Sequence, residues 1–140
     1  MAHLKRTAAD LELPFGERKR TYNSRLAQEL GKWAEAESSG DAFHLTAFKA
    51  YFVHGRNLAR LPVLLEIAES VGLDVIKARE VLEERRFAAA VDEDWQRSRR
   101  LAVRAVPTFR MGQETLVGAQ PYEALEGLMV RNRVPLRGAR

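Results

Sequence analysis

The sequence predicts a mainly helical α+β fold that closes with a small antiparallel hairpin and a last helix. Apolar residues recur at helical spacing from Asn23 to Val103, which is typical of packed amphipathic helices. Two short β-forming runs then flank Gly112-Gln113, and glycine at such a position favours a hairpin turn. Pro121 comes next and suits the first turn of a final helix.

Residues 1–20 are expected to be a polar lead-in, whose apolar alternation over 11–15 permits a short extended piece. Asn23 can cap the first helix, because its side chain accepts from a free N–H at the helix start. That helix is expected to run to about Glu37. Ser38-Ser39-Gly40 breaks it, and Asp41 is the predicted cap of the next helix.

The second helix, over about 42–54, is rich in aromatic residues. Phe48, Tyr51 and Phe52 lie three or four positions apart, so a regular helix brings them to one face. The ordinary interpretation of such a face is that it packs into the core.

Three more helices precede the hairpin, and the last of them is expected from about Ala88 to Val103. Pro62 suits the first turn of one helix, and Gly72 suits the left-handed position that follows it. Asp74 is the predicted cap of the next helix. In the helix after the hairpin, the residues expected to face inward are Leu125, Leu128 and Met129.

Composition excludes several function classes. The 140 residues contain no cysteine, so they supply no disulfide, no thiolate metal ligand and no thiol nucleophile. No apolar run approaches the ~18–20 residues of a membrane span, and no signal-peptide pattern opens the chain. A cytoplasmic location without a membrane partner is expected. His3, His44 and His54 do not share a helix face, so no metal site is predicted.

The net charge of +4 permits anionic partners without requiring them. The arginines that could form a basic patch are Arg97, Arg99, Arg100, Arg104, Arg110, Arg131, Arg133, Arg137 and Arg140. The acids that interrupt this set are Glu93, Asp94, Glu114 and Glu126. A nucleic-acid module usually adds a known reading element, so weak nucleic-acid binding ranks third among the functions considered.

Several stretches resemble one family. Val106-Pro107-Thr108-Phe109 resembles the cis-proline motif of the thioredoxin fold. Gly118-Ala119-Gln120-Pro121-Tyr122 resembles the DsbA-like group, which includes the FrnE-type dithiol oxidoreductases and the 2-hydroxychromene-2-carboxylate isomerases. Three stretches further upstream resemble landmarks of that family's helical insertion. They are Asn23-Ser24-Arg25-Leu26-Ala27, Ala50-Tyr51-Phe52 and Val71-Gly72-Leu73-Asp74. The resemblance covers roughly residues 12–130.

This resemblance implies a binding site. It implies a cis bond before Pro107, which exposes the backbone N–H and C=O of Val106 to an extended peptide or to glutathione. Val106, Pro107 and Thr108 are therefore the predicted substrate-binding residues. The family's pocket lies beside its helical insertion, and this makes Phe48, Tyr51 and Phe52 an alternative pocket wall rather than core. No catalytic residue and no bound cofactor are predicted, although glutathione remains a candidate ligand.

The resemblance also implies a missing part. A thioredoxin fold begins with a strand–helix–strand unit that carries a CxxC or a serine, and such a unit needs about 30 residues. Too few residues precede the first insertion helix here. The expectation is therefore a truncated thioredoxin-like fold in a single domain, 1–140, with a helical insertion (21–103), a ββα unit (104–131) and a tail (132–140).

The predicted function is a non-redox binding or assembly module. The alternative is a glutathione-dependent oxidoreductase or isomerase whose catalytic half another chain supplies or this sequence has lost. The sequence leaves open whether the protein is an enzyme. Because the hairpin lacks its usual neighbouring strands, its free edge invites another chain, and a homodimer through this edge and the helices is expected.

Overall fold

The computed structural model describes residues 2–17 and 20–135, and these form the mainly helical α+β fold that the sequence predicts. Packing divides the chain into two compact units, residues 1–93 and 94–140, which are described in turn. Residues 136–140 of the predicted tail lie outside the described part. No described helix is long and apolar enough to span a membrane.

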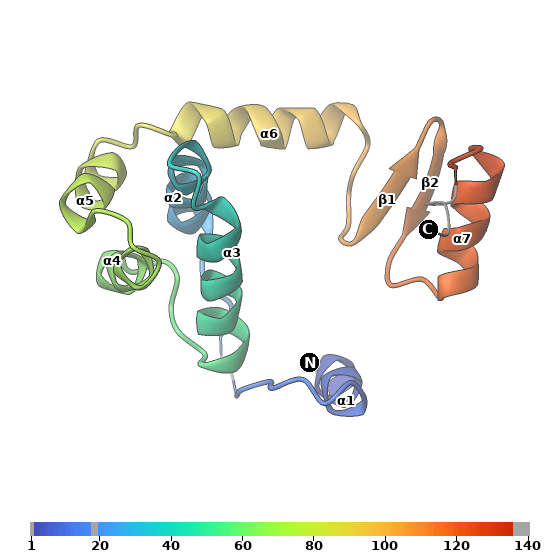
Figure 1. The fold of residues 1–140 in the computed structure, drawn as a ribbon, viewed down its shortest axis with the longest axis horizontal. Helices are drawn as coiled ribbons and strands as arrows, with labels where there is room; N and C mark the ends of the chain where they lie inside the picture. Colours follow the sequence, from blue (N-terminus) through green and yellow to red (C-terminus); the bar gives the residue numbers. More distant parts are fainter. Residues whose placement is uncertain (1, 18–19, 136–140) are drawn as a thin grey trace. The chain divides into compact units, whose positions relative to one another are not determined.

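The regular elements that the structure describes in the first unit are helices (Figure 1). Its elements are α1 (Ala2–Asp10), α2 (Arg25–Ala36), α3 (Gly40–Phe48), the π-helix η1 (Lys49–Val53), α4 (Leu61–Ser70), α5 (Val75–Glu83) and the start of α6 (Ala88–Arg100). The lead-in prediction was wrong, because α1 is a helix. Leu4, Ala8 and Leu11 recur at helical spacing, and the alternation that begins at Leu11 obscured this.

The core of the first unit lies among α2, α3, α4 and α5. Its least exposed apolar side chains are Leu30, Ala34, Phe43, Leu64, Ala68 and Ala78. Each comes from the stripe of a helix where apolar residues recur every three or four positions, so burying the stripes against one another removes them from water. This part of the fold follows directly from periodicity.

Several helices of this chain end in the same hydrogen-bonded motif, although the residue in the left-handed position is often not glycine. At α5 the N–H of Arg86 donates to the carbonyl of Val81 at 3.1 Å, and Arg85 adopts φ +54°. This is the Schellman arrangement, in which the left-handed residue is usually glycine. Four other helix ends repeat the Schellman arrangement, each with a non-glycine residue at positive φ. These residues are Glu12, Ser38, Ala102 and Arg133. Among the predicted glycines, Gly72 fits the motif with φ +78°.

The predicted caps differ in outcome. The Asp74 carboxylate accepts from the N–H groups of Ile76 and Lys77, as expected. The side chain of Asn23 accepts from the N–H of Arg25 at 2.8 Å, one residue ahead of the position that caps α2. Asp41 lies inside the first turn of α3, whose N-cap is Ser39, so the prediction for Asp41 was wrong.

The second unit contains the rest of α6, the strands β1 (Thr108–Met111) and β2 (Glu114–Val117), and α7 (Tyr122–Arg131) (Figure 1). The strands pair antiparallel around the Gly112-Gln113 turn, with Phe109 opposite Leu116. α6 ends at Arg100 instead of the predicted Val103, because the Schellman bond from Val103 to Ser98 closes it.

The hairpin and α7 are held together at one end by polar contacts. The carboxylate of Glu114 accepts from Arg131 at 2.7 Å and from Asn132 at 3.1 Å. Leu128 is buried and Leu125 half-buried, as predicted, but Met129 is 42% exposed. Phe109 and Met111 lie on one side of β1, since strand side chains alternate, and together with Leu128 they line a groove of about 330 Å³.

Candidate functional site

Within residues 2–17 and 20–135, the outer edge of β1 carries backbone groups that no other strand pairs with. The N–H of Gly118 donates to the carbonyl of Pro107 at 2.8 Å, and the register runs on from there to Met111 opposite Glu114. Hydrogen-bonded pairs alternate in an antiparallel ladder. Phe109 and Met111 therefore bond to β2, whereas the N–H and C=O of Thr108 and Arg110 point away from it.

Val106 lies just before β1, outside the paired strand. Its side chain is 88% exposed, and within the described residues its backbone N–H and C=O form no hydrogen bond. The hydroxyl of Thr108 donates to the carbonyl of Ala105 at 2.6 Å, which closes a short loop around Val106 and Pro107. The bond between Val106 and Pro107 is cis. The three residues predicted for the substrate site thus lie together at the start of β1.

The predicted aromatic wall lies in the first unit and is exposed. Phe48 is 59% and Phe52 37% exposed, and only Tyr51 packs against the core. The core interpretation was therefore wrong for Phe48 and Phe52. The buried aromatic residue of α3 is Phe43, which is 1% exposed. After Phe48 the chain turns into the π-helix η1, whose wider turn changes which residues share a face.

The structure does bring the three aromatic side chains together. The ring centroids of Tyr51 and Phe52 are 4.9 Å apart at 82°, and those of Phe48 and Phe52 are 6.4 Å apart. Phe15, which sequence reasoning missed, lies 6.1 Å from Phe52. Phe48 and Phe52 separate two surface pockets of about 410 and 240 Å³. The larger is apolar except for Lys49 at its wall, so it suits an apolar group.

Gly16 explains why Phe15 reaches this pocket. Its N–H donates to the carbonyl of Phe52 at 2.9 Å, and a Cβ at this position would lie 2.0 Å from the carbonyl oxygen of Val53. Only glycine permits so close an approach of two backbones. The lead-in segment is thereby held against the end of η1, with Phe15 beside Phe52.

A buried carboxylate is the principal polar feature of the first unit. Glu29 on α2 is fully buried. It accepts two hydrogen bonds of 2.7 Å from Arg85 and one of 2.6 Å from Arg25. Arg25 also donates to Asp92 and to the carbonyl of Ala88, both on α6. The network joins α2, the end of α5 and the start of α6, so its first role is structural.

Sequence reasoning missed this network, because Glu29 and Arg85 are 56 positions apart. Arg85 adopts the left-handed conformation just after α5, and from there its side chain donates to Glu29. Asp92, whose side chain is 55% exposed, is part of the same network. The sequence did contain one signal of this network, because Glu29 stands among the apolar residues on the buried side of α2.

The network predicts acid sensitivity. Hydrogen bonds from Arg85 lower the pKa of Glu29 below its ordinary 4.5, burial opposes this, and Arg25 adds to the lowering. A carboxyl whose pKa is lower when folded stabilises the protein above its unfolded pKa, and the contribution is lost as pH falls through the folded pKa.

We therefore expect the stability difference between the wild type and Glu29→Gln to be full at pH 7 and to shrink progressively below pH 4.5. Urea unfolding of both proteins at several pH values measures it. Comparison with the glutamine variant cancels the titration of the other carboxyls. A difference that stays constant down to pH 3 would contradict the assignment.

The histidines are the remaining candidate metal ligands. His44 lies 3.1 Å from the carboxylate of Glu35, and its hydrogen bond is the main cause that lowers the pKa of Glu35. No group of three potential metal ligands occurs within 2–17 and 20–135. The side chain of His3 lies outside the described residues, as do Arg137 and Arg140 of the predicted basic patch.

The sequence of this chain matches a protein-family model and a curated protein. A family model for the DSBA-like thioredoxin domain matches residues 1–130. YwbO of Bacillus subtilis (strain 168) is 28% identical over 102 residues, which make up 72% of this chain and 51% of YwbO. The chain therefore spans about half the length of this curated relative.

Solved structures show the same fold. A 2-hydroxychromene-2-carboxylate isomerase superposes with a TM-score of 0.79 at 24% identity, over 93% of this chain and 64% of the isomerase. The cytosolic disulfide reductase DsbM from Pseudomonas aeruginosa, solved with GSH, gives a TM-score of 0.67 at 24% identity, over 96% of this chain and 75% of DsbM. At these identities the likeness establishes a thioredoxin-like fold.

Proposed function

This chain belongs to the DsbA-like thioredoxin domain family, and from that membership we propose that it is a binding module that holds glutathione or another extended peptide along the outer edge of β1. Val106, Pro107 and Thr108 form the start of this edge. The ligand backbone adds a strand beside β1, in the manner of peptide recognition by strand addition.

One observation carries this proposal, namely the outward backbone groups of Thr108 and Arg110, preceded by Val106, whose backbone forms no hydrogen bond within the described residues. Alternate residues of a strand point their N–H and C=O to the same edge, and four residues of strand span about 13 Å. This length accommodates a tripeptide. Each backbone bond contributes a net ~0.5–1.5 kcal/mol, so a short ligand is expected to bind with a dissociation constant of about 1 mM.

A thiol in this site comes from the ligand. Thiol–disulfide exchange requires an attacking thiolate, and these 140 residues contain no cysteine. The names of the relatives, an isomerase and a disulfide reductase solved with GSH, support glutathione as the ligand class. They equally support the alternative, an oxidoreductase or isomerase that uses glutathione together with a part beyond these residues. The cytosolic relative supports a cytoplasmic location.

The edge can be tested with proline substitutions. Arg110 and Thr115 are cross-strand partners, and the backbone N–H of each points outward, on opposite edges of the hairpin. Proline removes a backbone N–H and is tolerated on edge strands. In calorimetric titration with reduced glutathione, we expect Arg110→Pro to weaken binding at least about tenfold, which corresponds to ~1.4 kcal/mol. Thr115→Pro is expected to bind as the wild type does.

Arg110→Ala separates the backbone from the side chain, because it keeps the N–H and removes the guanidinium. If Arg110→Ala and Arg110→Pro weaken binding equally, strand addition is wrong. Absence of heat and of NMR shifts with glutathione at about 10 mM, ten times the expected constant, would remove the proposed function itself. Turnover of glutathione with an electrophile would favour the enzyme over the binding module.

A further inference from the structure

A pocket of about 290 Å³ lies beside the buried ion-pair network of the first unit, and we call it the arginine pocket. Its wall consists of Asn23, Arg25, Leu26, Ala59 and Arg85. These residues come from the start of α2, the loop before α4 and the position just after α5. All of them belong to the first unit, where α2, α4 and α5 pack on one core. The pocket is therefore separate from the outer edge of β1.

Arg85 presents an unused hydrogen-bonding edge at this pocket. Its Nε and Nη2 each donate to the carboxylate of Glu29 at 2.7 Å. A guanidinium carries five N–H donors in a planar fork, so this pairing leaves the second N–H of Nη2 and both N–H groups of Nη1 without a partner in the described part of the chain. These groups form the other edge of the fork, and such an edge can bind two oxygens of one anion.

The buried carboxylate of Glu29 holds this edge in a fixed orientation. The side chain of Glu29 is 0% exposed, whereas that of Arg85 is 50% exposed, so one edge of the guanidinium is anchored and the other meets solvent. A donor that is already ordered loses little conformational freedom when a ligand binds. Arg25 donates to the same carboxylate at 2.6 Å and adds a second guanidinium to the wall of the pocket.

The start of α2 adds two weaker donors. Oδ1 of Asn23 accepts from the N–H of Arg25 at 2.8 Å, so the NH₂ group of this amide is left over, and it forms no hydrogen bond within the described residues. The N–H of Leu26 has no acceptor there either, because the first turn of a helix cannot satisfy its own N–H groups. Both groups can donate to an anion that the edge of Arg85 holds.

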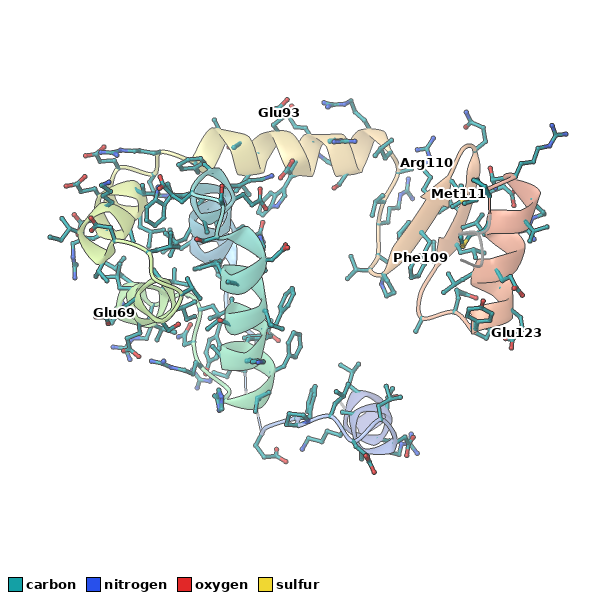
Figure 2. All side chains as sticks on the ribbon, viewed as in Figure 1. Glu69, Glu93, Phe109, Arg110, Met111 and Glu123 are labelled. Atoms are coloured by element: carbon teal, nitrogen blue, oxygen red, sulfur yellow. The ribbon has the colours of Figure 1, made fainter. Side chains whose placement is uncertain are left out.

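The network beside the pocket is electrically neutral. Arg25 and Arg85 contribute two positive charges. Glu29 offsets one of them, and Asp92, which accepts from Nη1 of Arg25 at 2.7 Å, offsets the other. Figure 2 labels the next acid, Glu93 on α6, whose side chain points away from α2. Because the positive charge is already offset, an anion gains mainly from directional N–H donors, and weak, millimolar binding is expected.

We propose that the arginine pocket binds a phosphate group, either as free phosphate or as a small phosphate ester. The groups that Arg85, Asn23 and Leu26 offer are donors, and the oxygens of a phosphate accept hydrogen bonds at several positions at once. A cation would meet only donors here. The side chains of Leu26 and Ala59 give the wall an apolar part, which suits the organic group of an ester.

Titration with inorganic phosphate, followed by ¹H–¹⁵N NMR, tests the proposal. Ionic strength is held constant with sodium chloride, so that chloride is the competing anion. We expect saturable shifts of the backbone N–H of Leu26 and of the Nε–H of Arg85 at millimolar phosphate. Phenyl phosphate is the second probe: tighter binding than that of phosphate identifies an ester site, and equal binding identifies free phosphate. The absence of saturable shifts with both probes would overturn the proposal.

Asn23→Asp is the most specific variant. It keeps the Oδ1 that accepts from the N–H of Arg25 and replaces the NH₂ donor by an anionic oxygen. Phosphate binding should weaken at least about tenfold, since like charges brought together oppose binding. Asn57→Asp is the matched control, because Asn57 accepts in the same way from the N–H of Ala59 at 2.9 Å and does not line the pocket. Equal weakening in both variants would show that phosphate responds only to net charge.

Asp92→Asn provides a test that misfolding cannot imitate, because it predicts tighter binding. Asp92 is 55% exposed and lies outside the wall of the pocket. Removing its charge leaves the network with a net charge of about +1, so phosphate should bind about two- to fivefold more tightly, the range of an exposed ion pair. Unchanged or weaker binding would contradict the proposal. Arg85→Lys keeps a positive charge near Glu29 but lacks the second edge, and it should lose phosphate binding.

Glutathione titration of Asn23→Asp keeps this proposal distinct from the proposed function. The two sites share no residue, so glutathione should bind this variant as it binds the wild type. Loss of glutathione binding together with phosphate binding in Asn23→Asp would show that the two ligands use one site, and it would overturn a separate phosphate pocket.

Discussion

Glu29→Ala is expected to lower the free energy of unfolding by about 2–4 kcal/mol. Removing one partner of a buried ion pair typically costs ~3–5 kcal/mol, because the other charge is left without compensation. The side chain of Glu29 is 0% exposed, whereas that of Arg85 is 50% exposed. Water therefore hydrates part of the Arg85 guanidinium in the variant. For this reason the expected loss of unfolding free energy is smaller than the largest typical values. Urea unfolding followed by circular dichroism measures it.

Glu84→Ala is the matched control for this experiment. Glu84 accepts a hydrogen bond of 2.7 Å from Arg86, the same length as the bonds from Arg85 to Glu29. Both partners are about half exposed, so this pair should contribute much less to the free energy of unfolding than the buried Glu29 does. Losses of equal size in the two variants would show that the burial of Glu29 does not determine its contribution.

Phe43→Ala is expected to destabilise the first unit by about 3–5 kcal/mol, whereas Phe48→Ala should cost less than ~1 kcal/mol. Both residues lie on α3, and both variants remove the same atoms. Phe43 is 1% exposed and its removal leaves a cavity in the core. Phe48 is 59% exposed and leaves only a wider surface pocket.

Chemical denaturation of the two variants gives the comparison directly. The helix propensity change is the same in both, so it cancels in the difference. A cost for Phe48→Ala as large as that for Phe43→Ala would mean that Phe48 is covered in solution, and its exposed face would then be an interface. The expected result leaves Phe48 free to line the two pockets beside Phe52.

Sequence reasoning recovered the features that local chemistry controls. The cap at Asp74 and the left-handed Gly72 each depend on residues within one turn of their own position. The hairpin depends on the Gly112-Gln113 turn and on the short runs beside it. The predicted site residues Val106 and Thr108 lie together for the same reason, since they are neighbours in the chain.

The candidate site was predicted less completely. The motif at Pro107 predicted where a ligand would lie, but which backbone groups of β1 point away from β2 follows only from the register of the two strands. The aromatic wall was identified, yet Phe15 was not, because its approach to Phe52 depends on the contact between Gly16 and Val53. A contact between segments that far apart in sequence leaves no periodic signal.

The sequence by itself determined the helices of the first unit other than α1, the hairpin and the family, because these are carried by spacing, turn residues and short motifs. Only the tertiary structure decided that Phe43 is buried while Phe48 is exposed, since the surroundings of α3 determine which face meets the core. It also decided that Glu29 is a buried partner of Arg85. The free energy of such a pair depends on burial and geometry between distant segments, which no local pattern encodes.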